Sequence, residues 1–166
     1  MINSHEKIFD RGQTINKLCA NKIAKGKMTP YTNHFEHGVV EIDNKNSVMY
    51  IATDKIVKHT SKRRNGKVLW QEWSFREDCY NKFYYQGQYL ETVYPADYNE
   101  STLNKKTIED KNYIVYRPVY KYPNNYSRMT KHYEMFGTYK FLGKETLPTG
   151  QTKCLYVRVN EGANII

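Results

Sequence analysis

The first apolar residues of the chain recur at the spacing of a helix. Four of them share one side of a helix: Ile15, Leu18, Cys19 and Ile23. Asp10, with Gln13 three residues later, resembles the capping box that opens a helix, and Gly26 is a residue at which a helix can end. This pattern predicts one helix over residues 11–25.

From Val39 onward the apolar residues alternate with polar ones, which is the period of a β-strand. The alternation predicts strands around residues 40–42, 48–52, 68–70, 83–85, 113–117, 135–142 and 154–159. Turn-forming residues separate strands at 43–46, 64–67 and 148–150. Asn65-Gly66 is the strongest turn signal, because both residues tolerate the positive φ of a tight hairpin.

Two further signals complete the element pattern. A short second helix is expected to open at Asn99 to Leu103, and Pro118 is expected to halt its strand or confine it to a sheet edge. About six to eight short strands and one or two helices indicate a β-rich α+β fold, and the frequent turns favour a closed barrel or sandwich.

Chain length and composition indicate a single domain over residues 1–166, because 166 residues with apolar positions along nearly the whole chain can bury one core. No stretch approaches the roughly 20 apolar residues of a membrane span, and the first residues do not resemble a secretory signal. The three cysteines are far apart and suggest no disulfide framework. We therefore expect a cytoplasmic protein.

The charge of the chain bears on its partners. Lys and Arg number 26 against 17 Asp and Glu, which gives a formal net charge of +9 and a pI near 9.3. Such an excess favours a polyanionic partner through long-range attraction. Nucleic acid is the commonest partner of this kind, and an anionic membrane and an acidic protein are the alternatives. We expect double-stranded DNA, no membrane association and no cofactor.

Basic residues and tyrosines are distributed in a way that fits this expectation. The densest basic group falls on a strand end and a hairpin tip: Lys55, Lys58, Lys62, Arg63, Arg64 and Lys67. A second, more scattered group comprises Lys121, Arg128, Lys131 and His132. Long basic side chains at a hairpin tip can reach phosphates, although a solvated charged loop has the same composition. The 16 tyrosines can stack on bases or replace Phe at half-buried strand positions.

Two arrangements are candidates for catalytic chemistry. His34 and His37 stand three apart but lack a third ligand at matching distance, so no metal site is expected there. Asp97 followed by Glu109 and Lys111 has the order of a Mg²⁺-dependent nuclease, in which two carboxylates hold the metal and the lysine orients water. Glu109 to Lys111 resemble a turn, however, whereas the nuclease pattern needs a strand.

The order of several short motifs resembles the SRA-like reader domains of modification-dependent restriction systems, which belong to the PUA-like β-barrels. The motifs are Gly12 to Asn16, Phe83 to Gln88, Asn99 to Lys105, Ile114 to Arg117 and Tyr133 to Tyr139. Leu90-Glu91-Thr92 stand where that family has a Gly-Asp pair, so the bound group is not specified. No nuclease module follows these motifs.

The resemblance implies a PUA-like or SRA-like β-barrel with an N-terminal helix and one short additional helix. It implies that a modified base, or a modified backbone, is held in an aromatic pocket, with Tyr85 and Gln88 at its mouth and Asp97 near its polar wall. The basic hairpin would clasp the duplex. The expected nucleic-acid-binding residues are Lys58, Lys62, Arg63, Arg64, Lys67, Tyr85, Gln88, Asp97 and Arg117.

The sequence thus indicates a module that recognises modified duplex DNA without catalysis of its own, in a restriction or anti-phage defence system, with any nuclease supplied by a partner protein. Two alternatives stay open. One is a phage or plasmid inhibitor that binds an acidic host defence protein, since aromatic residues and Arg also dominate protein interfaces. The other is the small Mg²⁺-dependent nuclease built on Asp97, Glu109 and Lys111.

Overall fold

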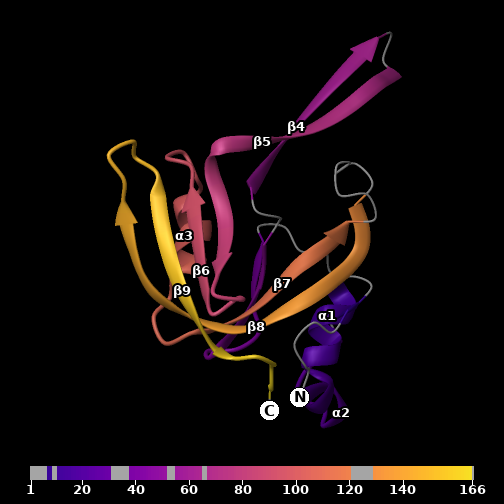
Figure 1. Ribbon diagram of the computed structural model, residues 1–166. Coiled ribbons are helices and arrows are strands. Elements are labelled where there is room, and N and C mark those ends of the chain that lie inside the picture. Colours follow the sequence, from indigo (N-terminus) through magenta and orange to yellow (C-terminus); the bar gives the residue numbers. More distant parts are fainter. Residues whose placement is uncertain are drawn as a thin grey trace.

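A computed structural model of the protein describes residues 7–8, 11–30, 38–51, 55–64, 67–120 and 129–165 (Figure 1). Its helices are α1 (Arg11–Leu18), α2 (Ala20–Ala24) and α3 (Glu100–Lys106). Its strands are β1 (Lys7–Ile8), β2 (Val39–Glu41), β3 (Asn46–Tyr50), β4 (Lys55–Arg64), β5 (Lys67–Tyr84), β6 (Tyr89–Tyr94), β7 (Asn112–Tyr120), β8 (Met129–Thr146) and β9 (Thr152–Asn160).

The strands form one mixed sheet in the order β2-β3-β7-β8-β9-β6-β5-β4, and β1 pairs with β8 off this path. All pairs are antiparallel except β3 with β7, which run parallel from Asn46↔Asn112 to Tyr50↔Tyr116. The expected β-rich α+β class is confirmed. The expected closure into a barrel is not, because the sheet path ends at β2 and β4 and no pairing joins those two strands within the described residues.

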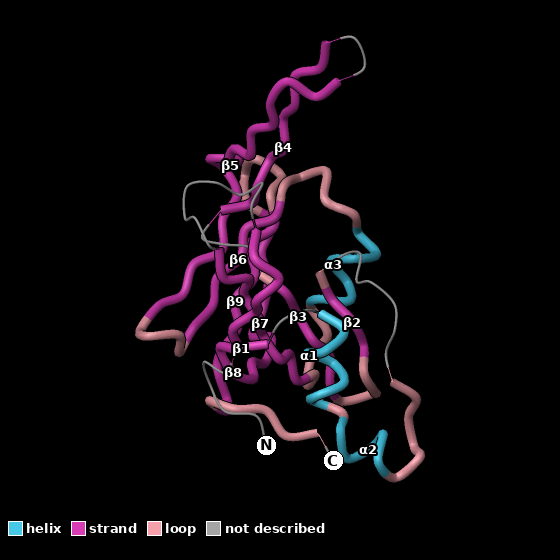
Figure 2. The backbone as a smooth tube through the Cα atoms, turned by 90° about the vertical axis from the view of Figure 1, so that its right-hand side faces the viewer, coloured by secondary structure: helices cyan, strands magenta, loops and turns pink. Residues whose placement is uncertain are grey.

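The sheet is apolar on both faces where β3 and β7 lie side by side. Val48, Tyr50, Ile114 and Tyr116 belong to one core cluster, which also includes Ile15, Leu18 and Cys19 from the α1–α2 segment. The alternate residues Met49, Tyr113 and Val115 belong to a second cluster, against which Leu103 of α3 packs. Since successive strand residues point to opposite faces, α1 and α2 cover one face of these strands and α3 covers the other (Figure 2).

The N-terminal helical segment differs from the single helix predicted over residues 11–25. It is interrupted at Cys19, whose φ of −100° and ψ of 15° leave the helical range. The backbone N–H of Cys19 still bonds to the carbonyl of Ile15 at 2.9 Å, and the N–H of Ile23 bonds to the carbonyl of Cys19 at 3.0 Å, so helical hydrogen bonding continues on both sides of the break. Gly26 has a φ of 68° and follows α2, as expected of a helix stop. No helix in the described parts of the chain is long and apolar enough to cross a membrane.

Several other sequence predictions are confirmed. The turn at residues 43–46 joins β2 and β3, and Asn99 caps α3 by accepting the Thr102 N–H at 3.0 Å. Arg64 pairs with Lys67, which is the register of a two-residue hairpin loop, although Asn65-Gly66 lie outside the described residues. Pro118 lies beyond the last β3–β7 pair, at an edge as predicted, because β7 has lost one neighbour there.

Candidate functional site

A long two-stranded ribbon projects from the edge of the sheet. Val57 pairs with Phe75 and Arg64 with Lys67, whereas β5 pairs with β6 only over Tyr80 to Tyr84. Residues 57–64 and 67–75 therefore have no other strand beside them in the described chain, and we call them the arm. In Figure 1 the arm extends well away from the rest of the sheet. At about 3.3 Å per residue, its eight residues of β4 span roughly 25 Å.

The arm is set off from the sheet by an irregularity in the ladder. Between the pairs Lys55↔Tyr80 and Val57↔Phe75, β4 advances past Ile56 alone while β5 advances past residues 76–79. Extra residues on one strand of a pair bend that strand and increase its twist. A second register shift, between Lys62 and Arg63, lies near the tip of the arm. The sequence predicted the tip of this hairpin but did not predict the bend.

The arm carries most of the basic residues expected to bind nucleic acid. Five Lys or Arg fall within it, against a single acidic residue, Glu72: Lys58, Lys62, Arg63, Arg64 and Lys67. In the ladder Lys58 is opposite Ser74 and Lys62 is opposite Trp70. Both tryptophans of the chain, Trp70 and Trp73, also belong to the arm. Charge and aromatic residues are thus concentrated on one projecting element.

The turn after β5 holds Tyr85 in an unusual conformation. Tyr85 and Gln86 have φ angles of 51° and 57°, which residues other than glycine rarely adopt, and the Tyr85 side chain is 81% exposed. Tyr139 donates its hydroxyl hydrogen bond to the Gly87 carbonyl at 2.5 Å. The Gln88 side-chain amide donates to the carbonyl of Arg158 at 3.2 Å, so Gln88 serves to anchor the turn. Backbone strain of this kind persists only where the surroundings hold it.

Gly87 is required in this turn. Its φ is 88°, and a Cβ added there would lie 2.9 Å from Nη1 of Arg158. The Arg158 side chain is only 13% exposed, and its Nη2 lies 3.6 Å from a carboxylate oxygen of Glu161. The turn that carries the exposed Tyr85 ring is therefore anchored by hydrogen bonds to Tyr139 of β8 and Arg158 of β9.

Arg117 takes part in a stack of planar groups that connects three strands. Its guanidinium carbon lies 4.8 Å from the ring centroid of Phe136 in β8. The Phe136 ring stacks on Phe83 of β5, with centroids 4.8 Å apart and planes 18° from parallel. Attraction between a guanidinium and an aromatic face adds to the packing energy. Arg117 thus links β7 to β5 through β8, a role that its sequence position did not indicate.

The three residues of the nuclease pattern have separate environments. Asp97 is exposed in the loop before α3, and Glu109 is exposed in a turn, as the sequence indicated. Lys111 is 4% exposed, and its Nζ lies 3.0 Å from the carbonyl oxygen of Asp43 and 3.4 Å from Oε2 of Glu41. No group of three His, Cys, Asp or Glu that could hold a metal occurs within the described residues.

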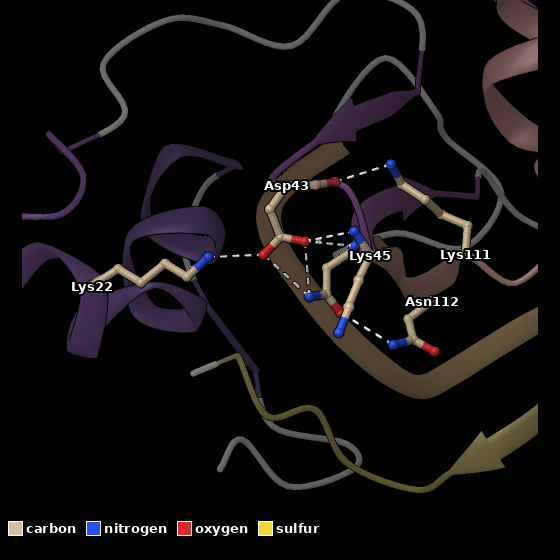
Figure 3. A network of polar contacts seen from close by, with 6 residues as sticks. Lys22, Asp43, Lys45, Lys111 and Asn112 are labelled. Carbon is tan, nitrogen blue, oxygen red and sulfur yellow. Dashed lines mark hydrogen bonds and ion pairs between the residues drawn. The ribbon is translucent and has the colours of Figure 1, made fainter.

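Asp43 is the centre of a polar network that sequence reasoning missed (Figure 3). Its carboxylate accepts hydrogen bonds from Nζ of Lys22 at 2.8 Å, from the Lys45 N–H at 2.8 Å and from the Asn46 N–H at 2.9 Å. Burial raises the pKa of this carboxyl, but these hydrogen bonds outweigh it and lower the pKa to about 2. With Lys111 on its carbonyl, Asp43 ties α2 and the β2–β3 turn to the start of β7.

Lys106, at the end of α3, is a buried lysine among tyrosine rings. Its side chain is 6% exposed, and its Nζ donates to the Tyr98 hydroxyl oxygen at 2.9 Å. The same nitrogen lies 5.2 Å from the ring centroid of Tyr94, and the rings of Tyr94 and Tyr98 stack at 4.5 Å. No carboxylate pairs with Lys106 in the described part of the chain. Burial lowers the pKa of Lys106 to about 8.

The expected binding residues are therefore not gathered into one pocket. β5 runs from the arm at Lys67 to the turn at Tyr85, so the basic hairpin and the exposed tyrosine lie at opposite ends of an 18-residue strand. Asp97 follows the far end of β6, whereas Gln88 precedes its start. Five of the six expected basic residues lie together in the arm, and Tyr85 and Gln88 lie together in the turn after β5, whereas Asp97 and Arg117 lie apart from both groups.

Comparison with known proteins found no match for this chain in family models, in curated proteins or in solved structures.

Proposed function

We propose that this protein binds double-stranded DNA and that the arm makes the main contact with the duplex. The observation that carries the proposal is the coincidence of charge and shape in one element. Lys58, Lys62, Arg63, Arg64 and Lys67 all lie on a two-stranded ribbon with no other strand beside it. A two-stranded ribbon is one of the elements that fit the major groove of B-DNA, which is about 12 Å wide.

The charge of the arm supports nucleic acid as its partner. Each lysine or arginine that neutralises a phosphate releases condensed counterions, and this release supplies a large share of binding free energy. Basic residues on an exposed strand also discourage pairing with another strand. The same residues therefore favour the binding of phosphates by the arm and disfavour its pairing with the edge of another sheet.

The resemblance to SRA-like domains adds a finer proposal, in which the duplex carries a modified base and the curved sheet is an open form of the PUA-like barrel. We assign the base contact to Tyr85, because its 81% exposed ring stands on a turn fixed by Tyr139 and Arg158. An exposed tyrosine ring can stack on a base while its hydroxyl stays in water. In a restriction or anti-phage system, cleavage would then come from a partner protein.

Charge reversal within the arm tests the proposal. The triple variant Lys62→Glu, Arg63→Glu, Arg64→Glu should bind a duplex at least tenfold more weakly, and its salt slope should fall by up to about 3, because each lost phosphate contact removes about 0.9. Fluorescence anisotropy of a labelled duplex at several salt concentrations measures both. The same titration with duplexes that carry modified cytosine or phosphorothioate tests the finer proposal through a preference for one of them.

A matched control separates the arm from net charge. Lys25, Lys27 and Lys144 are exposed and lie outside the arm. Reversing all three lowers the formal net charge from +9 to +3, as the arm variant does, because each reversal removes two charges. Equal losses in the two triple variants would mean that overall charge, not the arm, attracts DNA. Absence of salt-dependent binding by the unmodified protein would overturn the proposal and favour an acidic protein partner.

A further inference from the structure

The face of β5, β6 and β9 opposite α3 carries a group of aromatic side chains. Tyr156 belongs to the core cluster against which α3 packs, so Val157, the next residue of β9, points to the opposite face. Val157 pairs with Tyr89 of β6, which in turn pairs with Tyr84 of β5. Paired residues point to the same face, so these three side chains form a row across three strands. Together with Tyr85 they are called the tyrosine patch.

The tyrosine patch is open to solvent. Within the described residues, neither core cluster includes any of its members. Tyr85 is 81% exposed, and Tyr84 and Tyr89 are half-buried. The rings of Tyr85 and Tyr89 meet edge to face, with centroids 6.1 Å apart and planes 75° from parallel. A ring that is exposed to this extent keeps a flat face available for stacking.

The conformation of the turn at Tyr85 favours a functional role for its ring. The Tyr84 carbonyl accepts the Gly87 N–H at 3.2 Å, and the positive φ angles of Tyr85 and Gln86 between them are those of a type I′ turn. Asn and Gly are the usual residues of such a turn, because they tolerate positive φ. A tyrosine at this position strains the backbone and also leaves an aromatic ring in water. Residues that a protein keeps at such a cost are concentrated at functional and ligand-binding sites.

Lys82 places a positive charge beside the patch. Its side chain is exposed, and its Nζ lies 4.9 Å from the ring centroid of Tyr84. Glu91 stands opposite Lys82 in the ladder, but its carboxylate accepts a hydrogen bond from the Tyr80 hydroxyl. No salt bridge to Lys82 occurs in the part of the chain that the structure describes. Flat rings with a cation beside them suit a ligand that has both bases and phosphates.

We propose that the tyrosine patch binds unpaired nucleotides by stacking, so that the preferred ligand is a duplex with a single-stranded extension. The arm holds the duplex, which rests on the proposed function, and the patch holds the extension. Bases inside a duplex are covered by their neighbours, whereas an unpaired base has a free face for an aromatic ring. β5 connects the two contacts, since it runs from Lys67 in the arm to Tyr84 in the patch. A ligand that reaches both binds the second at a high effective concentration.

Fluorescence anisotropy with a labelled oligonucleotide of about 16 thymidines tests the patch without a duplex, because a single-strand site covers about 4–16 nucleotides. Tyr85→Ala should weaken binding about fivefold or more, which is the usual effect of losing one stacked ring. Tyr85→Phe keeps the ring and should bind as the native protein does. Gln86→Ala is the matched control, because Gln86 is exposed and has a positive φ in the same turn. Circular dichroism confirms that each variant is folded.

Lys82→Gln tests the patch without a change in the turn. It should reduce the salt slope of oligonucleotide binding by about 0.7, which is the value for one phosphate contact on a single strand. A slope equal to that of the native protein would contradict a phosphate contact at the patch.

Binding to three ligands separates this inference from the function of the arm. The arm variant Lys62→Glu, Arg63→Glu, Arg64→Glu should lose the blunt duplex and keep most of its binding to the oligonucleotide. The native protein should bind a duplex with a thymidine extension more tightly than the blunt duplex. If the oligonucleotide does not bind, or if Tyr85→Ala binds it as Gln86→Ala does, the patch is refuted while duplex binding by the arm stands. If the oligonucleotide binds through Tyr85 but no duplex shows salt-dependent binding, the arm fails and the patch stands.

Discussion

At the scale of single residues, Lys106 is the clearest case of a group whose role depends on its surroundings. A lysine at the end of a short helix is ordinarily solvated, yet this one is 6% exposed beside Tyr94 and Tyr98. Tyrosine rings and one hydroxyl oxygen partly replace water around the ammonium group. They do not replace it fully, since burial lowers the pKa of Lys106 from 10.5 to about 8.

This shift makes a prediction about stability and pH. The folded protein binds fewer protons than the unfolded chain between pH 8 and 10.5, so the contribution of Lys106 to stability should improve as pH rises through that window. Below pH 8 its cost should be constant, at as much as about 3 kcal/mol, because one pKa unit corresponds to about 1.4 kcal/mol. Lys106→Met should therefore gain stability relative to the native protein at pH 7, with the gain shrinking toward pH 10.

Urea denaturation at a series of pH values checks this prediction. Lys105→Met, at an exposed neighbouring position of α3, is the matched control because it removes one lysine from the same helix. If the stability difference between Lys106→Met and the native protein stays the same from pH 7 to pH 10, the pKa of Lys106 is not lowered in the folded state.

Asp43 illustrates what a sequence conceals at this scale. Asp43-Asn44-Lys45-Asn46 was predicted as a turn, and the bonds from Asp43 to the Lys45 and Asn46 N–H groups are those of such a turn. Its bond to Lys22 joins residues 21 positions apart, and the bond from Lys111 to its carbonyl joins residues 68 apart. Local turn chemistry could be predicted, whereas partners brought in by the fold could not.

At the scale of elements, the arm forms its strand pairs within itself and not with the rest of the sheet. Lys58 pairs with Ser74, and the residues beyond this pair bond to each other across the ribbon. The strand pairs that connect β5 to the core run from Tyr80 to Tyr84. Elements of this kind contribute little to global stability and can open locally.

Shortening the arm should therefore separate binding from folding. Joining Lys58 directly to Ser74 through an Asn-Gly turn removes the tip of the arm but preserves a cross-strand pair at its base. We expect a melting temperature within a few degrees of the native value and loss of most duplex binding. Thermal unfolding followed by circular dichroism, with the anisotropy titration, measures the two effects. A shortened protein that fails to fold would show that the arm belongs to the cooperative core.

Sequence patterns predicted the elements better than their extent. Alternation located most of the strands, and Asn65-Gly66 located the hairpin whose strands pair at Arg64 and Lys67. The bend of β5 at residues 76–79 and its length of 18 residues were not predictable, because alternation is the same in a free ribbon and in a sheet. The helix predicted over residues 11–25 is interrupted at Cys19, a buried position that the helical pattern treated as ordinary.

At the scale of the whole molecule, the arm projects from one end of the sheet and α2 lies at the other end (Figure 1). The sequence predicted the basic hairpin, and the resemblance to SRA-like domains placed Tyr85 and Gln88 at the mouth of one pocket with Asp97 near its wall. That arrangement assumed a closed barrel, whereas the sheet path ends at β2 and β4. The long-range parallel pair of β3 and β7 has no local signature, so the topology could not be read from alternation.

The intrinsic fluorescence of the two tryptophans tests the central claim most directly, because Trp70 and Trp73 both lie in the arm. Adding an unlabelled duplex at low salt should change tryptophan emission. Raising the salt from about 50 mM to about 200 mM should reverse that change, since counterion release drives the binding. If an independent measurement shows that the duplex binds but the tryptophan emission does not change, the DNA contact lies elsewhere on the protein and the account is contradicted.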